Sequence, residues 1–319
     1  MIKDYFKIEK NPKKGLLALE WAMLTYMVLT TVTMLFTYTK LVNPESMIWG
    51  RIRVFVITGA LWAVYRMIPC RITKMARITA QMALLAWWYP DTYEINRMFP
   101  NLDHVFAGWE QQIFGCQPAL HFAKALPWAV VSELMDMGYF MYYPMIAGVV
   151  FFYFFRRYQE LERISFVILT SFFLYYVMFI FVPVAGPTFY YEAVGIHDIA
   201  QGIFPALGDY FNTHTDCLVT PGYTDGIFYH LVEDAKAAGE RPTAAFPSSH
   251  VSISTICMLL AWHTKNRKLV YTLLPFYIFL CMATVYIQAH YLIDAIAGFV
   301  SAIVVYYILM YFTKGLKEP

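Results

Sequence analysis

The last long apolar segment of the chain, residues 269–312, reads LVYTLLPFYIFLCMATVYIQAHYLIDAIAGFVSAIVVYYILMYF. It consists of two apolar runs, 269–288 and 291–312, and each is close to the roughly 20 residues that a helix needs to cross a bilayer. The runs part at a short polar corner between Gln288 and His290. The pattern predicts two spanning helices that meet at one membrane face.

The rest of the chain has the same apolar character. Hydrophobic residues make up 59% of it and charged residues 14%, with a mean hydropathy of +0.49. Soluble proteins contain roughly 45–50% apolar and about 25% charged residues, so the bilayer must cover much of this surface. We expect an all-α, polytopic transmembrane helix bundle of about eight spans, forming a single integral membrane domain over residues 1–319. The six further spans are 16–38, 51–69, 73–89, 128–155, 163–183 and 247–264.

Lys74 and Arg77 make the span at 73–89 the weakest of the eight, because they shorten its apolar stretch. With eight alternating spans, more than two thirds of the 24 Lys and Arg residues fall on the face that holds both termini. The positive-inside rule then predicts cytoplasmic termini. We expect a multi-pass protein of the bacterial cell (inner) membrane whose functional site lies on the outer, periplasmic face.

Two segments are expected outside the membrane. Residues 90–127 are typical of amphipathic helices that lie in the membrane interface, and 184–246 form a long loop rich in Gly, Pro, Asp and Tyr. Cys116 and Cys217 fall in these outer segments. An oxidising compartment would permit a disulfide between them, and two unpaired thiols are the equal alternative.

The end of the outer loop carries the first chemical motif, Phe246-Pro-Ser-Ser-His250. Proline followed by serine is typical of a helix start, where backbone amides without helix partners can bind an anion. Ser248 and Ser249 would add hydroxyl donors. His250 would stand in the first turn beside that anion. The catalytic motifs therefore fall within residues 247–312.

The second motif is His290-Tyr-Leu-Ile-Asp294. If both residues lie in a helix, this spacing places them on one face, and Asp294 can accept the proton of one imidazole nitrogen. His290 would then attack phosphorus and form a phosphohistidine, while His250 donates a proton to the leaving oxygen. An ordinary interfacial histidine is the alternative reading. Ionisable residues at membrane depth are costly, which favours function.

Further site residues follow with weaker support. Arg241 and Lys236 precede the serine motif and are candidates for phosphate binding, although a solvated loop charge explains each as well. Tyr190 and Tyr191 are candidates for a substrate pocket, and an aromatic belt at the interface is the alternative. Glu133 would steady the site or a helix end. We expect no metal ion and no other cofactor.

The serine motif at 247–250 followed by His290 and Asp294 resembles the second and third signature motifs of the type 2 phosphatidic acid phosphatase (PAP2) superfamily. The resemblance implies a six-helix catalytic core. It also implies that His250 is the proton donor, His290 the nucleophile and Asp294 the partner of the nucleophile.

The chain departs from that superfamily in two motifs. Ala283 and Thr284 stand where the third motif has Ser-Arg, and the first motif, a Lys followed by Arg-Pro, is replaced by VPVAGPTFY at 182–190. This pattern resembles the inositol phosphorylceramide synthase branch, which also lacks that Arg. The residues Asp103, Phe114-Gly115, Pro118, Glu133, Tyr139 and Tyr143 are similar to bacterial relatives of that branch.

The resemblance implies a membrane lipid phosphotransferase or phosphatase. It favours transfer of a head group from a phospholipid donor to a ceramide or diacylglycerol acceptor, with hydrolysis of a lipid phosphate or isoprenoid diphosphate as the rival. A non-enzymatic lipid transporter is a third possibility, but transporters normally place ionisable groups near the bilayer midplane. We expect lipids and no nucleic acid as partners. The sequence leaves the head group, the acceptor and the oligomeric state open.

Overall fold

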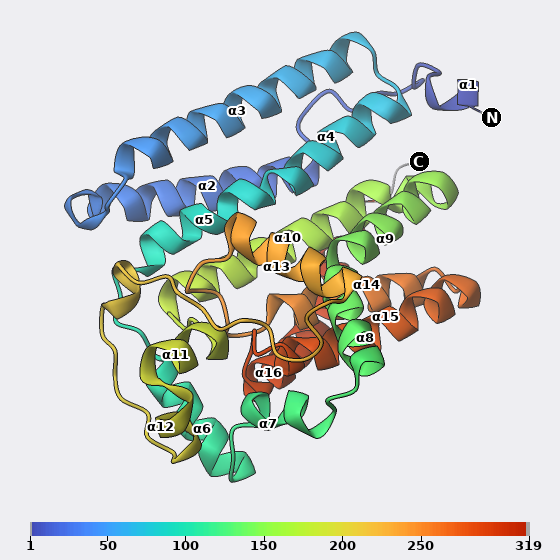
Figure 1. The fold of residues 1–319 in the computed structure, drawn as a ribbon. Helices are drawn as coiled ribbons and strands as arrows, with labels where there is room; N and C mark the ends of the chain where they lie inside the picture. The colour runs from blue at the N-terminus through green and yellow to red at the C-terminus, as the bar shows by residue number, and fades with distance from the viewer. Residues whose placement is uncertain (1, 317–319) are drawn as a thin grey trace.

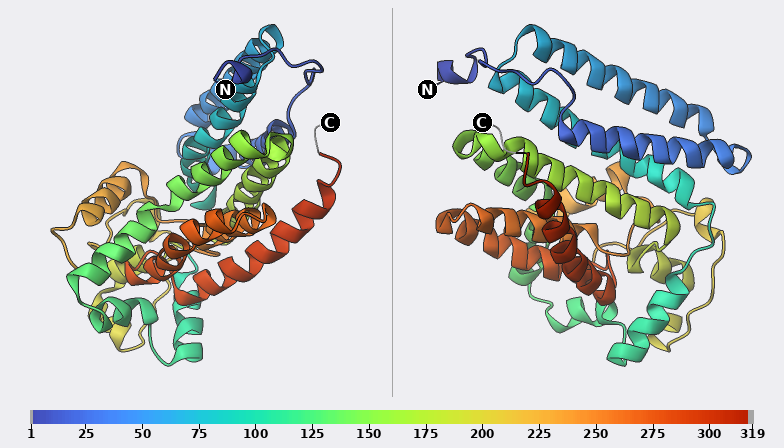
Figure 2. Two further views of the ribbon diagram at one scale, coloured as in Figure 1. Left: turned by 90° about the vertical axis from the view of Figure 1, so that its right-hand side faces the viewer. Right: turned by 180° about the vertical axis from the view of Figure 1, so that it is seen from behind.

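The structure, a computed structural model, describes residues 2–316 as a bundle of α-helices (Figure 1). Within this range no residue lies in a β-strand. The expected all-α helical bundle is therefore confirmed. Figures 1 and 2 show α1 and the last turn of α16 toward one end of the molecule, and the short helices α6, α7, α11 and α12 toward the other.

The N-terminal helices form a layer of their own on one side of the bundle (Figure 2). Pro44 begins the longest of them at the first helical position, where its missing N–H costs nothing. The layer packs through α2 and α5 against α10. Its helices are α1 (Ile2–Tyr5), α2 (Ala18–Phe36), a 3₁₀ turn (Tyr38–Lys40), α3 (Pro44–Met67), α4 (Arg71–Ala83) and α5 (Leu85–Asn96).

Six further helices form the second part of the bundle. They are α8 (Ala129–Phe140), α9 (Tyr142–Arg156), α10 (Leu161–Phe181, after a 3₁₀ turn at Tyr158–Glu160), α14 (Ser249–His263), α15 (Arg267–Tyr286) and α16 (Leu292–Phe312). The α14 helix is central, because α9, α10, α15 and α16 all pack against it. Its approach to α16 is close: a Cβ on Gly298 would lie 2.6 Å from the carbonyl oxygen of Ser248.

Short helices connect the two parts at one end (Figure 1). Residues 90–127 contain the end of α5 together with α6 (Asp103–Phe114) and α7 (Pro118–Ala125). The loop at 184–246 contains α11 (Pro187–Val194), α12 (Ile196–Ala200), a 3₁₀ turn (Tyr210–Asn212) and α13 (Ile227–Gly239). The side of the membrane on which they lie stays a prediction.

Among the residues that the structure describes, five helices are long and apolar enough to cross a membrane: α2, α3, α10 with its preceding turn, α15 and α16. The α8–α9 pair, bent by 49°, adds a sixth span if it crosses as one unit. The expected span at 73–89 is divided between α4 and α5, which meet at Leu84. The expected span at 247–264 is α14, which has only 15 residues. The structure thus supports a polytopic membrane protein with fewer clear spans than expected.

Arg51 corrects the predicted charge distribution. The sequence places Arg51 at the outer end of the span expected at 51–69, but α3 begins at Pro44 and Arg51 lies buried inside it. Its guanidinium forms two hydrogen bonds with the carboxylate of Asp91 on α5, at 2.7 and 2.9 Å. Because the charge of Arg51 is paired with that of Asp91, this residue can be buried within the helix layer. Composition alone predicts that such a charged side chain faces water.

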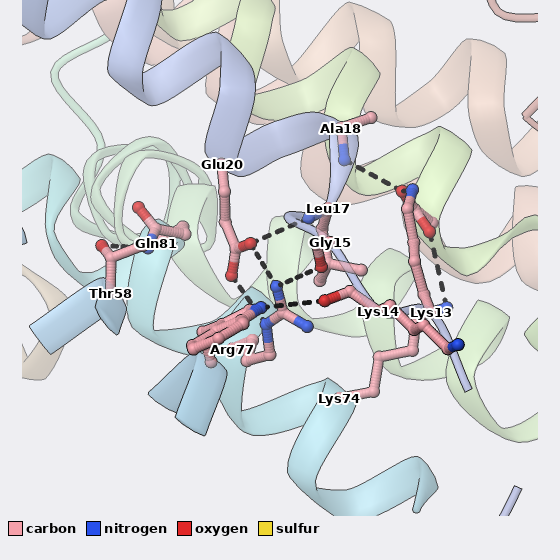
Figure 3. A network of polar contacts seen from close by, with 12 residues as sticks. Lys13, Lys14, Gly15, Leu17, Ala18, Glu20, Thr58, Lys74, Arg77 and Gln81 are labelled. Carbon is pink, nitrogen blue, oxygen red and sulfur yellow. Dashed lines mark hydrogen bonds and ion pairs between the residues drawn. The ribbon is translucent and has the colours of Figure 1, made fainter. Parts of the chain in front are cut away.

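Buried charges also join α4 to its neighbours (Figure 3). The guanidinium of Arg77 bonds the carboxylate of Glu20 on α2, with its Nε 2.8 Å from Oε1. Lys74 lies 3.5 Å from the carboxylate of Glu162 on α10, and Lys13 bonds the same carboxylate. The two charges that weakened the predicted span at 73–89 are therefore paired inside the protein.

Candidate active site

The polar corner predicted at 288–290 is a turn between α15 and α16, and it holds the buried side chain of His290. The backbone amide of His290 donates to the carbonyl of Thr284 at 2.9 Å, which closes the end of α15. Thr284 stands where the superfamily motif has Arg, and here it supports the turn through its backbone.

A backbone carbonyl determines which nitrogen of His290 can react. His290 Nδ1 lies 2.9 Å from the carbonyl oxygen of Ala245. Because a carbonyl only accepts, Nδ1 must carry the hydrogen, and the neutral ring keeps its lone pair on Nε2. Burial lowers the pKa of His290 to about 4, although the Ala245 carbonyl and the charge of Glu240 act in the opposite direction. His290 is therefore neutral near pH 7.

The free nitrogen of His290 faces His250. His290 Nε2 and His250 Nδ1 are 3.5 Å apart, although the two residues are 40 positions apart in the chain. His250 lies in the first turn of α14, where Tyr139 stacks on its ring at 4.6 Å between centroids and Tyr142 packs at 4.4 Å. The structure thus brings together the two histidines that the motifs singled out.

Asp294 lies beside His290 without a hydrogen bond to it, and its predicted role of orienting that ring stays a prediction. Its Oδ2 accepts from the amide of Tyr291 at 2.9 Å, which caps α16, and lies 3.7 Å from His290 Nδ1. The spacing argument required both residues in one helix, but α16 begins at Leu292 and His290 precedes it. The carbonyl of Ala245 makes the hydrogen bond that we had assigned to Asp294.

The two serines lie where the motif predicts, at the start of α14. Ser248 is buried and caps the helix, since its Oγ accepts from the amide of Val251 at 3.4 Å. The amides of Ser249 and His250 belong to the first turn and precede the helical hydrogen-bond pattern, so they are suited to an anion. Phosphate binding by Ser248 and Ser249 stays a prediction.

The two basic candidates make their hydrogen bonds within the loop. Lys236 donates to the carbonyl of Leu218, to Thr220 Oγ1 and to Glu233, each at 3.1 Å. Arg241 is exposed and donates to the carbonyl of Glu240 at 3.0 Å. The predicted phosphate contacts of Lys236 and Arg241 gain no support from these bonds.

The three pocket candidates also have structural partners. Tyr190 and Tyr191 are fully buried, and their hydroxyls donate at 2.9 Å to the carbonyl of Pro205 and to Gln117. Glu133 accepts from the amides at the start of α13. These contacts hold the outer helices together, and a role of the three residues in a substrate pocket stays a prediction.

Asp103 on α6 organises the backbone around the site, although we had not chosen it as a site residue. Its buried carboxylate accepts from the amides of Ala185 and Gly186 at 2.6 and 2.8 Å and from the hydroxyl of Tyr291 at 3.0 Å. These bonds hold the segment that replaces the first superfamily motif against the residue next to His290.

Glu110, on the same helix, binds the start of α16. Its Oε1 accepts from the amides of Leu292 at 2.5 Å and Ile293 at 3.4 Å. Burial raises the pKa of Glu110 to about 8. The seven-residue spacing from Asp103 to Glu110 places both on one helix face, and that periodicity was a usable signal in the sequence.

Glu240 is a third acidic residue that was not chosen from the sequence, because it lies in the loop just after α13. Its carboxylate interacts electrostatically with His290. Its Oε2 is buried and has no hydrogen-bond partner among the described residues. Burial raises the pKa of Glu240, while Lys236 and His290 lower it.

An apolar cavity of about 690 Å³ lies beside the start of α14. Val251 lines it directly after His250, and residues of α7, α15 and α16, among them Phe122, Tyr277 and Phe299, complete the walls. Within residues 2–316, no group of three or more His, Cys, Asp or Glu side chains could hold a metal ion. Cys116 and Cys217 are free thiols.

Comparison with known proteins gives one family. No curated protein and no solved structure matches the chain. The PAP2 superfamily matches residues 104–308, a range that begins in α6 and includes both histidines, Asp294 and most of α16. Because this match covers more than half of the chain, the protein belongs to the PAP2 superfamily.

Proposed function

We propose that this protein is a membrane lipid phosphotransferase or phosphatase that works through a phosphohistidine on His290. The observation that carries the proposal is the contact between His290 Nε2 and His250 Nδ1. The hydrogen bond of Nδ1 to the Ala245 carbonyl leaves the lone pair of His290 on Nε2. The nitrogen that faces it belongs to His250, whose imidazole can exchange a proton. Superfamily membership supports activity on lipid-like phosphoesters.

In the first half of the reaction, the phosphoryl group enters between the two rings and widens their 3.5 Å separation. The lone pair of His290 Nε2 forms a bond to phosphorus while the bond from phosphorus to the lipid oxygen breaks. His250 would take up a proton from solvent as the anionic phosphate binds beside it, and would give that proton to the lipid oxygen, so the lipid leaves as an alcohol. The amides of Ser249 and His250 would hold the phosphoryl oxygens.

In the second half, an acceptor hydroxyl gives its proton to His250 and attacks phosphorus. The bond between nitrogen and phosphorus breaks, and its electron pair returns to His290. Water as acceptor makes the enzyme a hydrolase, and a lipid alcohol makes it a transferase. The same histidines serve both reactions, so only the acceptor distinguishes them.

The cavity beside Val251 supports a lipid substrate. Its lining is almost entirely apolar, which suits an acyl chain whose ester phosphate reaches the histidines. A second apolar cavity, of about 280 Å³, lies between α4, α9 and α10 and includes Tyr143 among its walls. Two apolar cavities would hold the chains of two lipids, which favours transfer between them with ceramide or diacylglycerol as acceptor. The charge bias of the sequence favours an outward-facing site.

The test compares the purified wild-type protein with His290→Ala in detergent. Each protein is incubated with a mixture of glycerophospholipids, phosphatidic acid, an isoprenoid diphosphate, ceramide and diacylglycerol, and the products are measured by lipid mass spectrometry. We expect a new head-group lipid that forms with the wild type and is lost with His290→Ala. His197→Ala is the matched control, because that histidine is 81% exposed and should keep full activity.

The other possible results distinguish a hydrolase, a different catalytic residue and a transporter. Free phosphate or a free phosphorylated head group, lost in His290→Ala and unaffected by added acceptor, would make the protein a hydrolase. Product formation that persists in His290→Ala would overturn the phosphohistidine. Absence of any product, with lipid flux in vesicles that does not depend on His290, would point to a transporter.

A further inference from the structure

The imidazole of His250 has no acidic partner. Among residues 2–316, no carboxylate lies within ion-pair distance of its ring, and its one hydrogen-bond contact is with His290. His290 cannot balance a charge on His250, because it is itself neutral or bonded to phosphorus during the proposed reaction. That reaction nevertheless requires His250 to carry a proton in a partly buried place, where an uncompensated cation is costly.

Two tyrosine rings lie against this imidazole. The ring of Tyr139 stacks on it with 4.6 Å between the centroids and 24° between the planes. The ring of Tyr142 lies at 4.4 Å and is tilted by 43°. Among the described residues, the one other aromatic ring in contact with His250 is that of His290, at 5.7 Å. The faces of tyrosine rings attract a cation that lies within about 6 Å of the ring centroid.

The backbone holds both tyrosines in this place. Tyr139 belongs to the last turn of α8 and Tyr142 is the first residue of α9, so the 49° bend between these helices lies between them. The Tyr142 hydroxyl donates to the carbonyl of Ser249 at 3.4 Å, in the first turn of α14. Gly138 lets α8 approach α15 closely, because a Cβ there would lie 2.5 Å from the carbonyl carbon of Phe279.

We infer that Tyr139 and Tyr142 are positioning residues whose ring faces stabilise the protonated form of His250, so that it can serve as the proton donor. The inference rests on the proposed function and adds two residues to it. The rings take no proton and form no bond. They lower the free energy of the cationic imidazolium, which then gives its proton to the leaving oxygen and regains one from the acceptor hydroxyl.

Neutral rings suit this place better than an acid would. A carboxylate beside His250 would also favour the imidazolium, but its negative charge would repel the phosphate that has to bind there. The ring faces attract the imidazolium without adding a full negative charge to the site. This division leaves the anion to the start of α14 and the cation to the bend between α8 and α9.

The experiment varies the leaving group, because only a poor leaving group needs a proton. Dioctyl phosphate expels octanol, whereas octyl 4-nitrophenyl phosphate leaves the same phosphoryl group on His290 and expels a phenolate that is stable without a proton. Octyl phosphate and 4-nitrophenyl phosphate form a second pair, of monoesters. Tyr139→Leu and Tyr142→Leu should each lower kcat/KM for the octyl leaving group about tenfold, and should leave it nearly unchanged for the nitrophenyl group.

Two kinds of control variant separate ring faces from packing and from hydroxyl groups. Tyr139→Phe and Tyr142→Phe keep the ring faces, so the ratio of the two kcat/KM values should stay at the wild-type value. Tyr271→Leu is the matched control on α15, because this side chain is 66% exposed and should change neither reaction. Thermal unfolding in detergent shows that each variant is folded.

A double variant tests whether the rings act through His250. His250→Ala should itself lower kcat/KM for the octyl leaving group about a hundredfold or more. In that background, Tyr139→Leu should have no further effect, because the group that it serves is absent. An equal loss for both leaving groups, a further loss in the His250→Ala background, or no loss at all would overturn the inference. If neither pair of esters is consumed in a His290-dependent way, it is the proposed function that fails.

Discussion

At the scale of single residues, the site depends on which groups keep His290 neutral and hold its ring. The Ala245 carbonyl fixes the hydrogen on Nδ1, and burial opposes protonation of Nε2. Asp294, which the motif suggests as the partner of Nδ1, accepts with Oδ2 from the amide of Tyr291 at the start of α16, and its Oδ1 has no hydrogen-bond partner among the described residues. A histidine that attacks phosphorus needs a free lone pair, and this environment provides one at neutral pH.

The lowered pKa of His290 predicts activity that persists in mild acid. Protonation removes the lone pair, so kcat/KM should fall only as the pH approaches about 4. A histidine with the ordinary pKa of roughly 6.5 would be only about one tenth neutral at pH 5.5. We expect wild type to keep most of its activity there, measured from about pH 4 to pH 8. The negative charge of Glu240 raises the pKa of His290, so Glu240→Gln should move the acid limb to lower pH.

An acid limb centred near 6.5 or above would contradict this account of His290. The groups that face its ring are His250, Asp294 and Glu240, and the limb should respond to changes at these positions. His197→Ala, on the exposed surface, should leave the profile unchanged.

Asp103 allows a test of the backbone support. In Asp103→Asn, one acceptor oxygen becomes an NH₂ group that faces the donors of Ala185, Gly186 or Tyr291. We expect a loss of about 1–3 kcal/mol of stability, measured by thermal unfolding in detergent, together with reduced kcat. Asp198→Asn, which changes an exposed acid, should change neither quantity. Equal stability of the two variants would contradict the role of Asp103.

Sequence reasoning predicted the site in part. It placed His250 and His290 together because each motif has its own local signal, a helix start or a polar corner between apolar runs. Ala245 and Glu240 could not be found in this way. Ala245 contributes a backbone carbonyl, which leaves no trace in residue type, and Glu240 acts across a loop whose path depends on the packing of α13 against α8.

At the scale of elements, the distance between the histidines depends on how closely α14 lies on α16. Gly298 permits this approach, because any Cβ there would meet the Ser248 carbonyl at 2.6 Å and the Ser252 hydroxyl at 3.0 Å. Both partners lie in the first turns of α14, near His250. A shift of α14 away from α16 would therefore move one histidine of the pair and leave the other in place.

Gly298→Ala should lower kcat strongly through that shift. We expect at least about a tenfold loss, since misplacement by 1 Å can cost about a hundredfold, and about 1–3 kcal/mol of stability from overpacking. Gly148→Ala on α9 is the control, because its Cβ would meet nothing within 4 Å. That change should leave kcat intact and stabilise α9 by about 0.5–1 kcal/mol. Similar kcat values for both variants would contradict the prediction.

The helices could be predicted from the sequence where the length of an apolar run alone determines their bounds. The runs at 269–288 and 291–312 became α15 and α16 within a few residues. The segment at 73–89 is two helices and not one, and its charges at Lys74 and Arg77 pair with residues far away in the chain. The span predicted at 51–69 begins earlier, at Pro44, because Arg51 pairs with the distant Asp91 inside the helix layer. A prediction from the composition of a segment assumes that each charged side chain faces water. It cannot include ion pairs with residues far away in the sequence.

At the scale of the whole molecule, the chain combines a family core with an N-terminal layer. The PAP2 match begins at residue 104, after α1 to α5. The layer is attached to the core through α10, which contacts α2 and α5 and carries Glu162. The polar network of Figure 3 therefore links the two parts away from the histidines.

Glu20→Gln should destabilise the whole protein without changing its chemistry. The variant leaves the buried guanidinium of Arg77 unpaired, at a cost of about 3–5 kcal/mol. The double change of Glu20→Met with Arg77→Met should regain most of that loss. Thermal unfolding in detergent measures the stability, and the kcat of the folded fraction should equal that of wild type. A double variant as unstable as the single one would contradict the pairing.

The same charge pairs constrain the order in which the protein can assemble during synthesis. The segment 71–83 leaves the ribosome with Lys74 and Arg77 long before Glu162 has been made. Arg77 can pair at once with Glu20, which has already been made, whereas the contact of Lys74 with Glu162 cannot yet form. This buried contact between α4 and the core can therefore form only after α10 has emerged, so the packing of the first third of the chain is completed by the middle third.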